Sequence, residues 1–201
     1  MTTSTTDVAF SPAVKDVQAR LGSRNAYARV EAKGGWRREI DADLAGFIAA
    51  RDSFYLATAS AAGQPYVQHR GGAPGFLKVL GPTTLGFADF GGNRQYIPVG
   101  NLTENDRVQL FLMDYAGRRR VKIWGRARVV EDDADLLAQL VEPGTKAKVE
   151  RAIVVEITAW DVNCPQHIVP RYTEPQVAEV VEKLTARVAE LEAELAARAS
   201  P

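Results

Sequence analysis

The chain has 201 residues, and its 25 basic and 25 acidic side chains give a formal net charge of zero. Its hydrophobic fraction of 46% and charged fraction of 25% are those of an ordinary globular protein. A neutral chain is not expected to bind nucleic acid, and no apolar run approaches the roughly 18 residues that a membrane span needs. The single cysteine, Cys164, excludes a disulfide framework within the chain, and the first residues lack a secretory signal. We therefore expect a cytoplasmic protein.

The first fifty residues have helical patterns. Residues 1–10 are expected to form a loose tail. Ser11-Pro12 is a favourable helix start, and helices are predicted within residues 12–21, 23–35 and 41–51.

Short β-rich segments joined by hairpin-length turns follow. Strands are predicted at residues 53–60, 65–70, 76–80, 84–88, 107–115, 119–131 and 151–160. Apolar and charged residues alternate most clearly within 119–131, which indicates one buried and one exposed face. A helical turn is expected within 93–103 and a helix at 133–140. Because strands and helices do not alternate as in βαβ units, this order favours an antiparallel barrel.

The stretch from Phe87 to Gln95 combines an apolar strand end, an acid, two glycines and three polar side chains. Glycines permit left-handed backbone and close approach to a ligand, and successive N–H groups in such a turn form a nest for anions. The guanidinium of Arg94 matches phosphate oxygens. Residues 66–128 also contain ten basic and four acidic residues, a local charge of +6. These features favour a phosphate-binding loop, and a hairpin turn with a solvated arginine is the alternative.

Cys164 and His167 have the spacing of half a metal site. The chain has no second cysteine to complete a zinc set, and Pro165 disfavours a helix that presents both side chains together. We therefore predict neither a metal site nor a cysteine nucleophile here.

Apolar residues near the C-terminus recur at alternating steps of four and three, at Val177, Val181, Leu184, Val188, Leu191 and Leu195. This pattern is typical of a coiled-coil seam. A second copy of the chain is the simplest partner for it, and docking on the chain's own domain is the alternative.

Several motifs together resemble the FMN-binding split-barrel proteins related to pyridoxamine 5′-phosphate oxidase, over about residues 40–172. They are the segments 54–58, 68–72, 75–78, 87–95, 100–102, 119–125, 163–168 and 170–172. The resemblance is to the subgroup described as predicted flavin-nucleotide-binding.

The resemblance implies a mainly β protein with flanking helices, built on a six-stranded antiparallel split β-barrel. It implies a homodimer with FMN at the interface. The expected domains are an N-terminal helical extension (1–40), the FMN-binding barrel (41–172) and a C-terminal coiled-coil-like helix (173–201). The cofactor-binding residues implied are Gln68, His69, Arg70, Lys78, Asp89, Asn93, Arg94, Gln95, Arg120, Gln166 and His167.

Within that set, Asn93, Arg94 and Gln95 are expected at the FMN phosphate, with Lys78 at the phosphate or ribityl chain. The resemblance places Gln68, His69 and Arg70 along the flavin ring, with the backbone near Asp89 beside it. It also implies that Arg120 reaches the cofactor from its strand. Gln166 and His167 are expected to approach from the loop after the last strand.

The activity expected from the resemblance is that of an FMN-dependent oxidoreductase. It would pass hydride or electrons between a reduced nicotinamide and a small acceptor. A flavin-binding module without turnover is the alternative, as is a split barrel that binds deazaflavin F420 or haem. The segment with which the true oxidase recognises pyridoxal phosphate is replaced here by the loop at Cys164–His167 and the heptad helix, so vitamin B6 oxidation is not expected.

Overall fold

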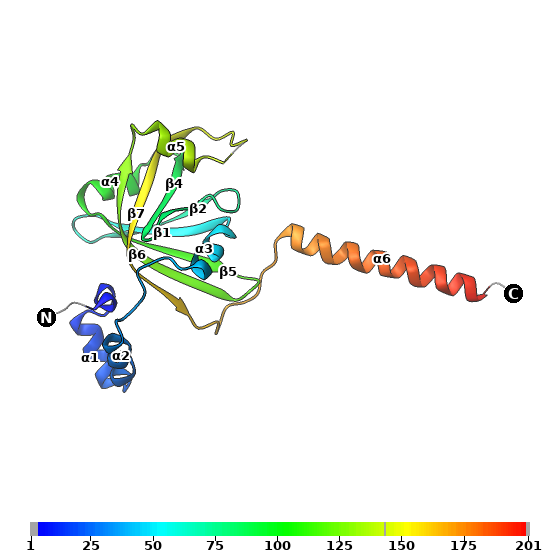
Figure 1. The fold of residues 1–201 in the computed structure, drawn as a ribbon, viewed down its shortest axis with the longest axis horizontal. Helices are drawn as coiled ribbons and strands as arrows, with labels where there is room; N and C mark the ends of the chain where they lie inside the picture. Colours follow the sequence, from blue (N-terminus) through cyan, green and yellow to red (C-terminus); the bar gives the residue numbers. More distant parts are fainter. Residues whose placement is uncertain (1–3, 143, 200–201) are drawn as a thin grey trace. The chain divides into compact units, whose positions relative to one another are not determined.

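The computed structural model describes residues 4–142 and 144–199. Contacts divide the chain into two units (Figure 1). The first lies within residues 1–114 and 119–164, and the second within residues 115–118 and 165–201. No described helix combines the length and the apolar character that crossing a membrane requires.

The N-terminal part of the first unit contains four short helices, η1 (Thr5–Val8), α1 (Pro12–Arg20), α2 (Arg24–Ala32) and α3 (Ala42–Ala49). The expectation of a loose tail is wrong for residues 4–8. Ser4 and Asp7 form a capping box on η1, which satisfies two backbone N–H groups at once. The hydroxyl of Thr5 also donates to the Trp36 carbonyl at 2.7 Å, so side-chain hydrogen bonds hold this segment in place.

Seven strands form one antiparallel sheet in the order β2-β1-β5-β6-β7-β4-β3. They are β1 (Ser53–Ala59), β2 (Pro65–Gly71), β3 (Lys78–Gly81), β4 (Thr84–Phe90), β5 (Arg107–Asp114), β6 (Arg119–Val130) and β7 (Val149–Asn163). The mainly β, antiparallel architecture is confirmed. The sheet has one strand more than the six that the resemblance implies, because it includes the short edge strand β3.

The central strand β6 has the alternation predicted from its sequence. Val121, Ile123 and Ala127 are buried, while Arg126 and Arg128 on the other face are exposed. The register between β6 and β7 shifts at Gly125, where an added Cβ atom would lie 2.6 Å from the Glu156 carbonyl oxygen. A glycine is therefore required where these two strands approach each other.

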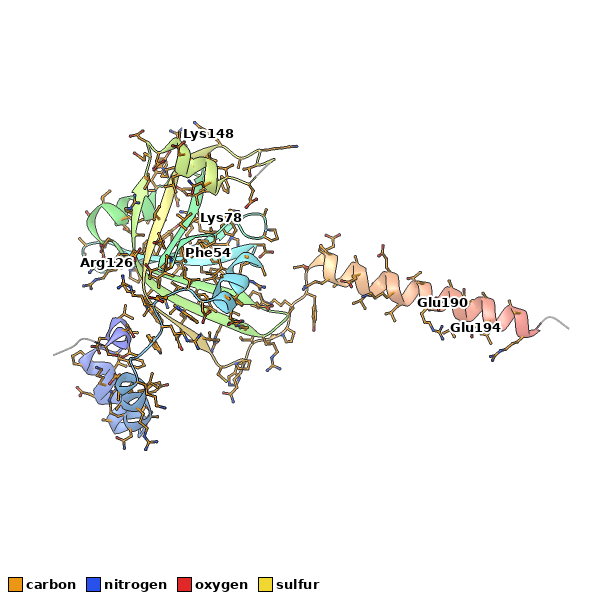
Figure 2. The ribbon with its side chains drawn as sticks, viewed as in Figure 1. Phe54, Lys78, Arg126, Lys148, Glu190 and Glu194 are labelled. Carbon is orange, nitrogen blue, oxygen red and sulfur yellow. The ribbon has the colours of Figure 1, made fainter. Side chains whose placement is uncertain are left out.

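The sheet curls around its core. Phe54 on β1 and Phe87 on β4 meet edge to face, with ring centroids 5.2 Å apart, although three strands separate β1 from β4 in the sheet. Phe54 lies among the strands in Figure 2, and α3 adds Leu44 and Ile48 to the same buried cluster. The two ends of the sheet are thus brought together by apolar packing, as in a barrel.

Two further helices lie between strands, α4 (Ile97–Glu104) and α5 (Ala134–Leu140). Both fall where helical structure is predicted. Strand β3 begins two residues later than expected, and β7 extends beyond the predicted residues 151–160 at both ends. The second unit contains α6 (Glu174–Ala199), one continuous helix of 26 residues, as the heptad pattern predicts. The proposed domain boundaries at residues 40 and 172 stay a prediction.

Candidate functional site

A cavity of about 230 Å³ lies at the end of β2 and β4. Polar groups come from both strands and from the loop after β4, and the start of α4 closes one side. The lining residues are Gln68, Arg70, Asp89, Phe90, Gly92, Asn93, Arg94, Tyr96, Pro98, Val99 and Glu150. The structure therefore brings together Gln68, Arg70, Asp89, Asn93 and Arg94 of the predicted set.

Asp89 is the most buried charged group in this cavity, with 6% of the residue exposed. Its carboxylate forms an ion pair with Arg70, and the Nε atom of Arg151 lies 3.5 Å from its other oxygen. Arg151 also contacts the carboxylates of Glu150 at 2.8 Å and Glu131 at 3.1 Å. Because a buried carboxylate is costly without partners, these two arginines are what allow Asp89 to sit at the cavity wall.

Two buried atoms of the cavity residues have no hydrogen-bond partner within the described part of the chain. They are the Oε1 atom of Gln68, an acceptor, and the Nε atom of Arg70, a donor. A buried polar atom without a partner costs about 1–3 kcal/mol. A ligand with one N–H or O–H donor and one acceptor would remove both costs, so the cavity is suited to a ring rich in heteroatoms.

The loop after β4 has unusual backbone geometry. Arg94 and Tyr96 have positive φ angles of 61° and 53°, whereas Gly91 and Gly92 do not. The left-handed positions of this loop are therefore Arg94 and Tyr96 and not its glycines. A left-handed non-glycine residue costs about 1–3 kcal/mol, and such costs concentrate at ligand-binding and active sites.

Side-chain hydrogen bonds hold this loop. The Nε atom of Arg94 donates to the Tyr96 hydroxyl at 3.2 Å, and Asn93 Oδ1 accepts the backbone N–H of Gln95 at 3.2 Å. The hydrogen bond with Tyr96 and the charge of Glu150 hold the pKa of Arg94 above its ordinary value. The guanidinium of Arg94 is a cation at the cavity wall, and the residue is exposed to solvent.

The other predicted residues lie elsewhere. His69 occupies the opposite face of β2 from Gln68 and Arg70, and its ring meets Tyr55 edge to face at 5.6 Å. Lys78 on β3 forms an ion pair with Glu142; it is labelled in Figure 2. Gln95 is exposed in the loop after β4, beside the cavity residues Arg94 and Tyr96.

Arg120 lies on the outer face of β6, paired in register with Met113 of β5. Gln166 and His167 are exposed residues of the second unit, and its placement relative to the first is not determined. His167 has a positive φ of 63°. The cofactor role of every predicted residue stays a prediction.

The residues of the cavity wall that were not predicted from the sequence include Tyr96, Pro98 and Glu150. Tyr96 and Pro98 come at the start of α4, and Glu150 comes from β7, opposite Asp89 and Phe90. Proline near the start of a predicted helix was the available signal for Pro98, because that position needs no N–H donor. No local pattern marks Glu150, whose place depends on the pairing of β4 with β7.

The family model described as pyridoxamine 5′-phosphate oxidase matches residues 40–164 of the sequence. The chain belongs to this family. The matched region contains the whole sheet and every residue that lines the cavity. No curated protein matches the chain in sequence.

Solved structures with a similar fold include a putative pyridoxamine 5′-phosphate oxidase of Lactobacillus delbrueckii. It is 21% identical, with 62% of this chain and 95% of that chain covered and a TM-score of 0.49. An FMN-binding protein of Syntrophomonas wolfei is 12% identical, with 76% and 95% covered and a TM-score of 0.48. HutZ, the haem storage protein of Vibrio cholerae, is 17% identical, with 62% and 94% covered and a TM-score of 0.44.

Proposed function

We propose that the protein binds FMN and is an oxidoreductase that moves hydride or electrons between a reduced nicotinamide and a small acceptor. The observation that carries this proposal is the buried, unpartnered Oε1 atom of Gln68 in a cavity that also contains Arg70 and Arg94. FMN offers a ring N–H donor, ring acceptors and a phosphate. These are the groups that an amide oxygen and two guanidinium groups recognise.

The residues present fit this group. Arg94 would hold the phosphate together with Asn93 and Gln95, while Gln68 and Arg70 would line the ring. Lys78 could take part only by exchanging its ion pair with Glu142.

When bound, FMN supplies the hydride and electron chemistry. The protein's part is to orient the ring and set its potential through nearby charges. The paired charges of Arg70 and Asp89 would serve that purpose in this proposal.

A homodimer is part of the same proposal. The cavity, at about 230 Å³, is smaller than the ~300–1,000 Å³ of most small-molecule sites, so a second subunit would supply a further wall. Tyr55 and Val67 leave 36% and 60% of their surfaces exposed on the outer face of β1 and β2. Such apolar side chains suit a subunit interface. His69 lies on that face, and in this proposal it approaches the cofactor of the partner subunit.

The decisive experiment is the visible absorption spectrum of the purified protein, with the released chromophore identified by mass. Two flavin bands and the mass of FMN are expected. A colourless protein that also fails to bind added FMN would contradict the proposal. The spectrum of deazaflavin F420 or of haem would show that this molecule, and not FMN, is the ligand. If it is haem and its axial ligand is a histidine, that histidine is His69 or His167.

A flavin-binding module without turnover is the second candidate, favoured by the long exposed helix α6, which is typical of an interaction device. Steady-state oxidation of NADH and NADPH with a panel of acceptors distinguishes the two. Turnover that depends on bound flavin supports the oxidoreductase, and its absence with every acceptor supports the module.

A further inference from the structure

Helix α6 carries an apolar stripe whose side chains are exposed. Every described side chain from Glu174 to Arg198 is exposed. The stripe residues leave between 41% and 65% of their surfaces open: Val177, Val181, Leu184, Val188, Leu191 and Leu195. A helix in water obtains most of its stability from packing of such a stripe, so this one requires a partner surface.

We propose that two copies of α6 pair as a parallel, in-register, two-stranded coiled coil. In the heptad notation abcdefg, Val181, Val188 and Leu195 fall at position a, and Leu184 and Leu191 fall at position d. A β-branched residue at a with leucine at d favours two parallel strands over three or four. The heptad therefore indicates both the number of helices and their direction.

The charges beside the seam favour the same direction. Arg187 falls at position g and Glu192 at position e of the next heptad. In a parallel, in-register pair these two positions of different helices are neighbours, so each Arg187 lies beside Glu192 of the second copy. Two such opposite-charge pairs flank the centre of the coil.

The antiparallel alternative brings like charges together. The antiparallel register that keeps all six stripe residues in apolar contact pairs Leu184 with Val188 and Val181 with Leu191. That register places Arg187 beside Arg187 of the second copy, which is unfavourable. The residues flanking the seam therefore select against it.

Within one helix, Arg187 contacts Glu190 at 2.8 Å. Both side chains are more than half exposed, and an exposed ion pair of this kind contributes little to stability. Arg187 can therefore leave Glu190 and pair with Glu192 of the second copy at little cost in free energy. Glu190 and Glu194 lie on one side of the helix in Figure 2, one turn apart. Neither occupies an a or d position. The a and d positions from Val177 to Leu195 are all valine or leucine, so the seam itself carries no charge.

About three heptads form a weak coiled coil on their own. A second contact between the same two chains would raise the effective concentration of the helices and stabilise the pair. A parallel coil has its two-fold axis along the helices, which is compatible with a closed, two-fold symmetric dimer. The pairing of α6 does not depend on the flavin proposal, and its test does not use the cofactor.

The test is disulfide formation in the full chain. Cys164 is the only cysteine and is exposed, so the parent variant is Cys164→Ser. Leu191→Cys in that background is expected to give a disulfide-linked dimer on mild oxidation, because position d faces its own copy. Ala193→Cys, at position f on the far side of the helix, is the matched control and is expected to stay monomeric on a non-reducing gel.

The antiparallel register separates the two copies of position 191 by ten residues along the axis, about 15 Å. It predicts instead a link between Leu191→Cys and Val181→Cys when the two variants are mixed. Preference for that mixed link, or equal dimer yields at positions 191 and 193, would overturn the proposal.

Charge reversal provides a second, independent readout. Arg187→Glu is expected to lower the disulfide yield of the Leu191→Cys variant about fivefold, since two like-charge contacts replace two ion pairs. Adding Glu192→Arg is expected to restore the yield. An unchanged yield in Arg187→Glu, or no recovery in the double variant, contradicts the parallel register.

Discussion

The guanidinium of Arg70 on β2 is ion-paired with the carboxylate of Asp89 on β4, although β1, β5, β6 and β7 lie between these strands in the sheet. Only curling of the sheet brings them together. The same pair forms one wall of the cavity, so the cavity exists only when the sheet has curled.

We expect this pair to contribute to stability. Arg70→Ala and Asp89→Ala should each lower the free energy of unfolding. The double variant should lose less than the sum, with a coupling energy of about 2 kcal/mol, because each single change removes one partner of a buried charge, and Asp89 then keeps only Arg151. Urea unfolding of the four proteins measures this cycle. Additive losses would mean that the pair stabilises nothing.

The same two residues are expected to shift the potential of bound FMN in opposite directions. Arg70→Ala removes a positive charge and leaves Asp89 with Arg151 as its remaining ion-pair partner, so the local charge becomes more negative and the midpoint potential should fall. Asp89→Asn leaves Arg70 uncompensated and should raise it, because nearby positive charge favours the anionic reduced flavin. Spectroelectrochemical titration measures both. A potential unchanged in both variants, with FMN still bound, would remove the pair from this role.

Arg94 is predicted to bind the phosphate. Arg94→Ala should weaken FMN binding about 10- to 100-fold, the range for a charge-assisted hydrogen bond, and should leave riboflavin binding almost unchanged. Fluorescence titration with the two ligands measures the difference. Arg128→Ala, an exposed arginine outside the cavity, is the matched control and should affect neither. Equal weakening of FMN and riboflavin would place Arg94 away from the phosphate.

Gly125 is predicted to be essential to the sheet. An added Cβ atom would lie 2.6 Å from the backbone oxygen of Glu156, so Gly125→Ala must displace β7 and should cost about 2–4 kcal/mol. Gly46→Ala in α3 is the matched control. It meets nothing within 4 Å and should gain about 0.5–1 kcal/mol from helix propensity. Thermal or urea unfolding separates the two, and a neutral Gly125→Ala would show that the strands can part without cost.

Glu156 is predicted to make stability depend on pH. Thr83, Thr84 and Arg38 hydrogen-bond to its carboxylate, with the Thr83 contact at 2.5 Å, and these bonds hold its pKa below the ordinary value of 4.5. A carboxyl with a lowered pKa binds its proton less readily when folded. Its contribution is therefore complete above pH 4.5 and is lost as the pH falls through the folded pKa.

Glu156→Gln should therefore be less stable than the parent near neutral pH, and the two should converge in acid. Unfolding measured from pH 7 downward tests this. A difference that stays constant with pH would mean that the carboxylate charge is not responsible.

The elements that could be predicted from sequence are those whose signal is local. The alternation within residues 119–131, the proline and polar helix starts, and the heptad of α6 each arise from side-chain periodicity against a buried or open face. Residues 4–8 were not predicted as structure because what holds them includes a hydrogen bond from Thr5 to Trp36, 31 residues away. The position of Glu150 in the cavity wall and the contact of Arg151 with Asp89 could not be predicted, because no local pattern specifies which residue of β7 lies opposite Asp89.

The sequence by itself determined that Gln68 and Arg70 share one side of a strand, that a polar loop follows residue 90, and that α6 carries one apolar stripe. Only the tertiary structure decided that Asp89 meets Arg70, that Lys78 pairs with Glu142, and that left-handed backbone falls at Arg94 and Tyr96 instead of the glycines. Periodicity specifies the face on which a side chain lies. Its partner across the fold is set by strand order and by the curl that packing of Phe54 against Phe87 imposes.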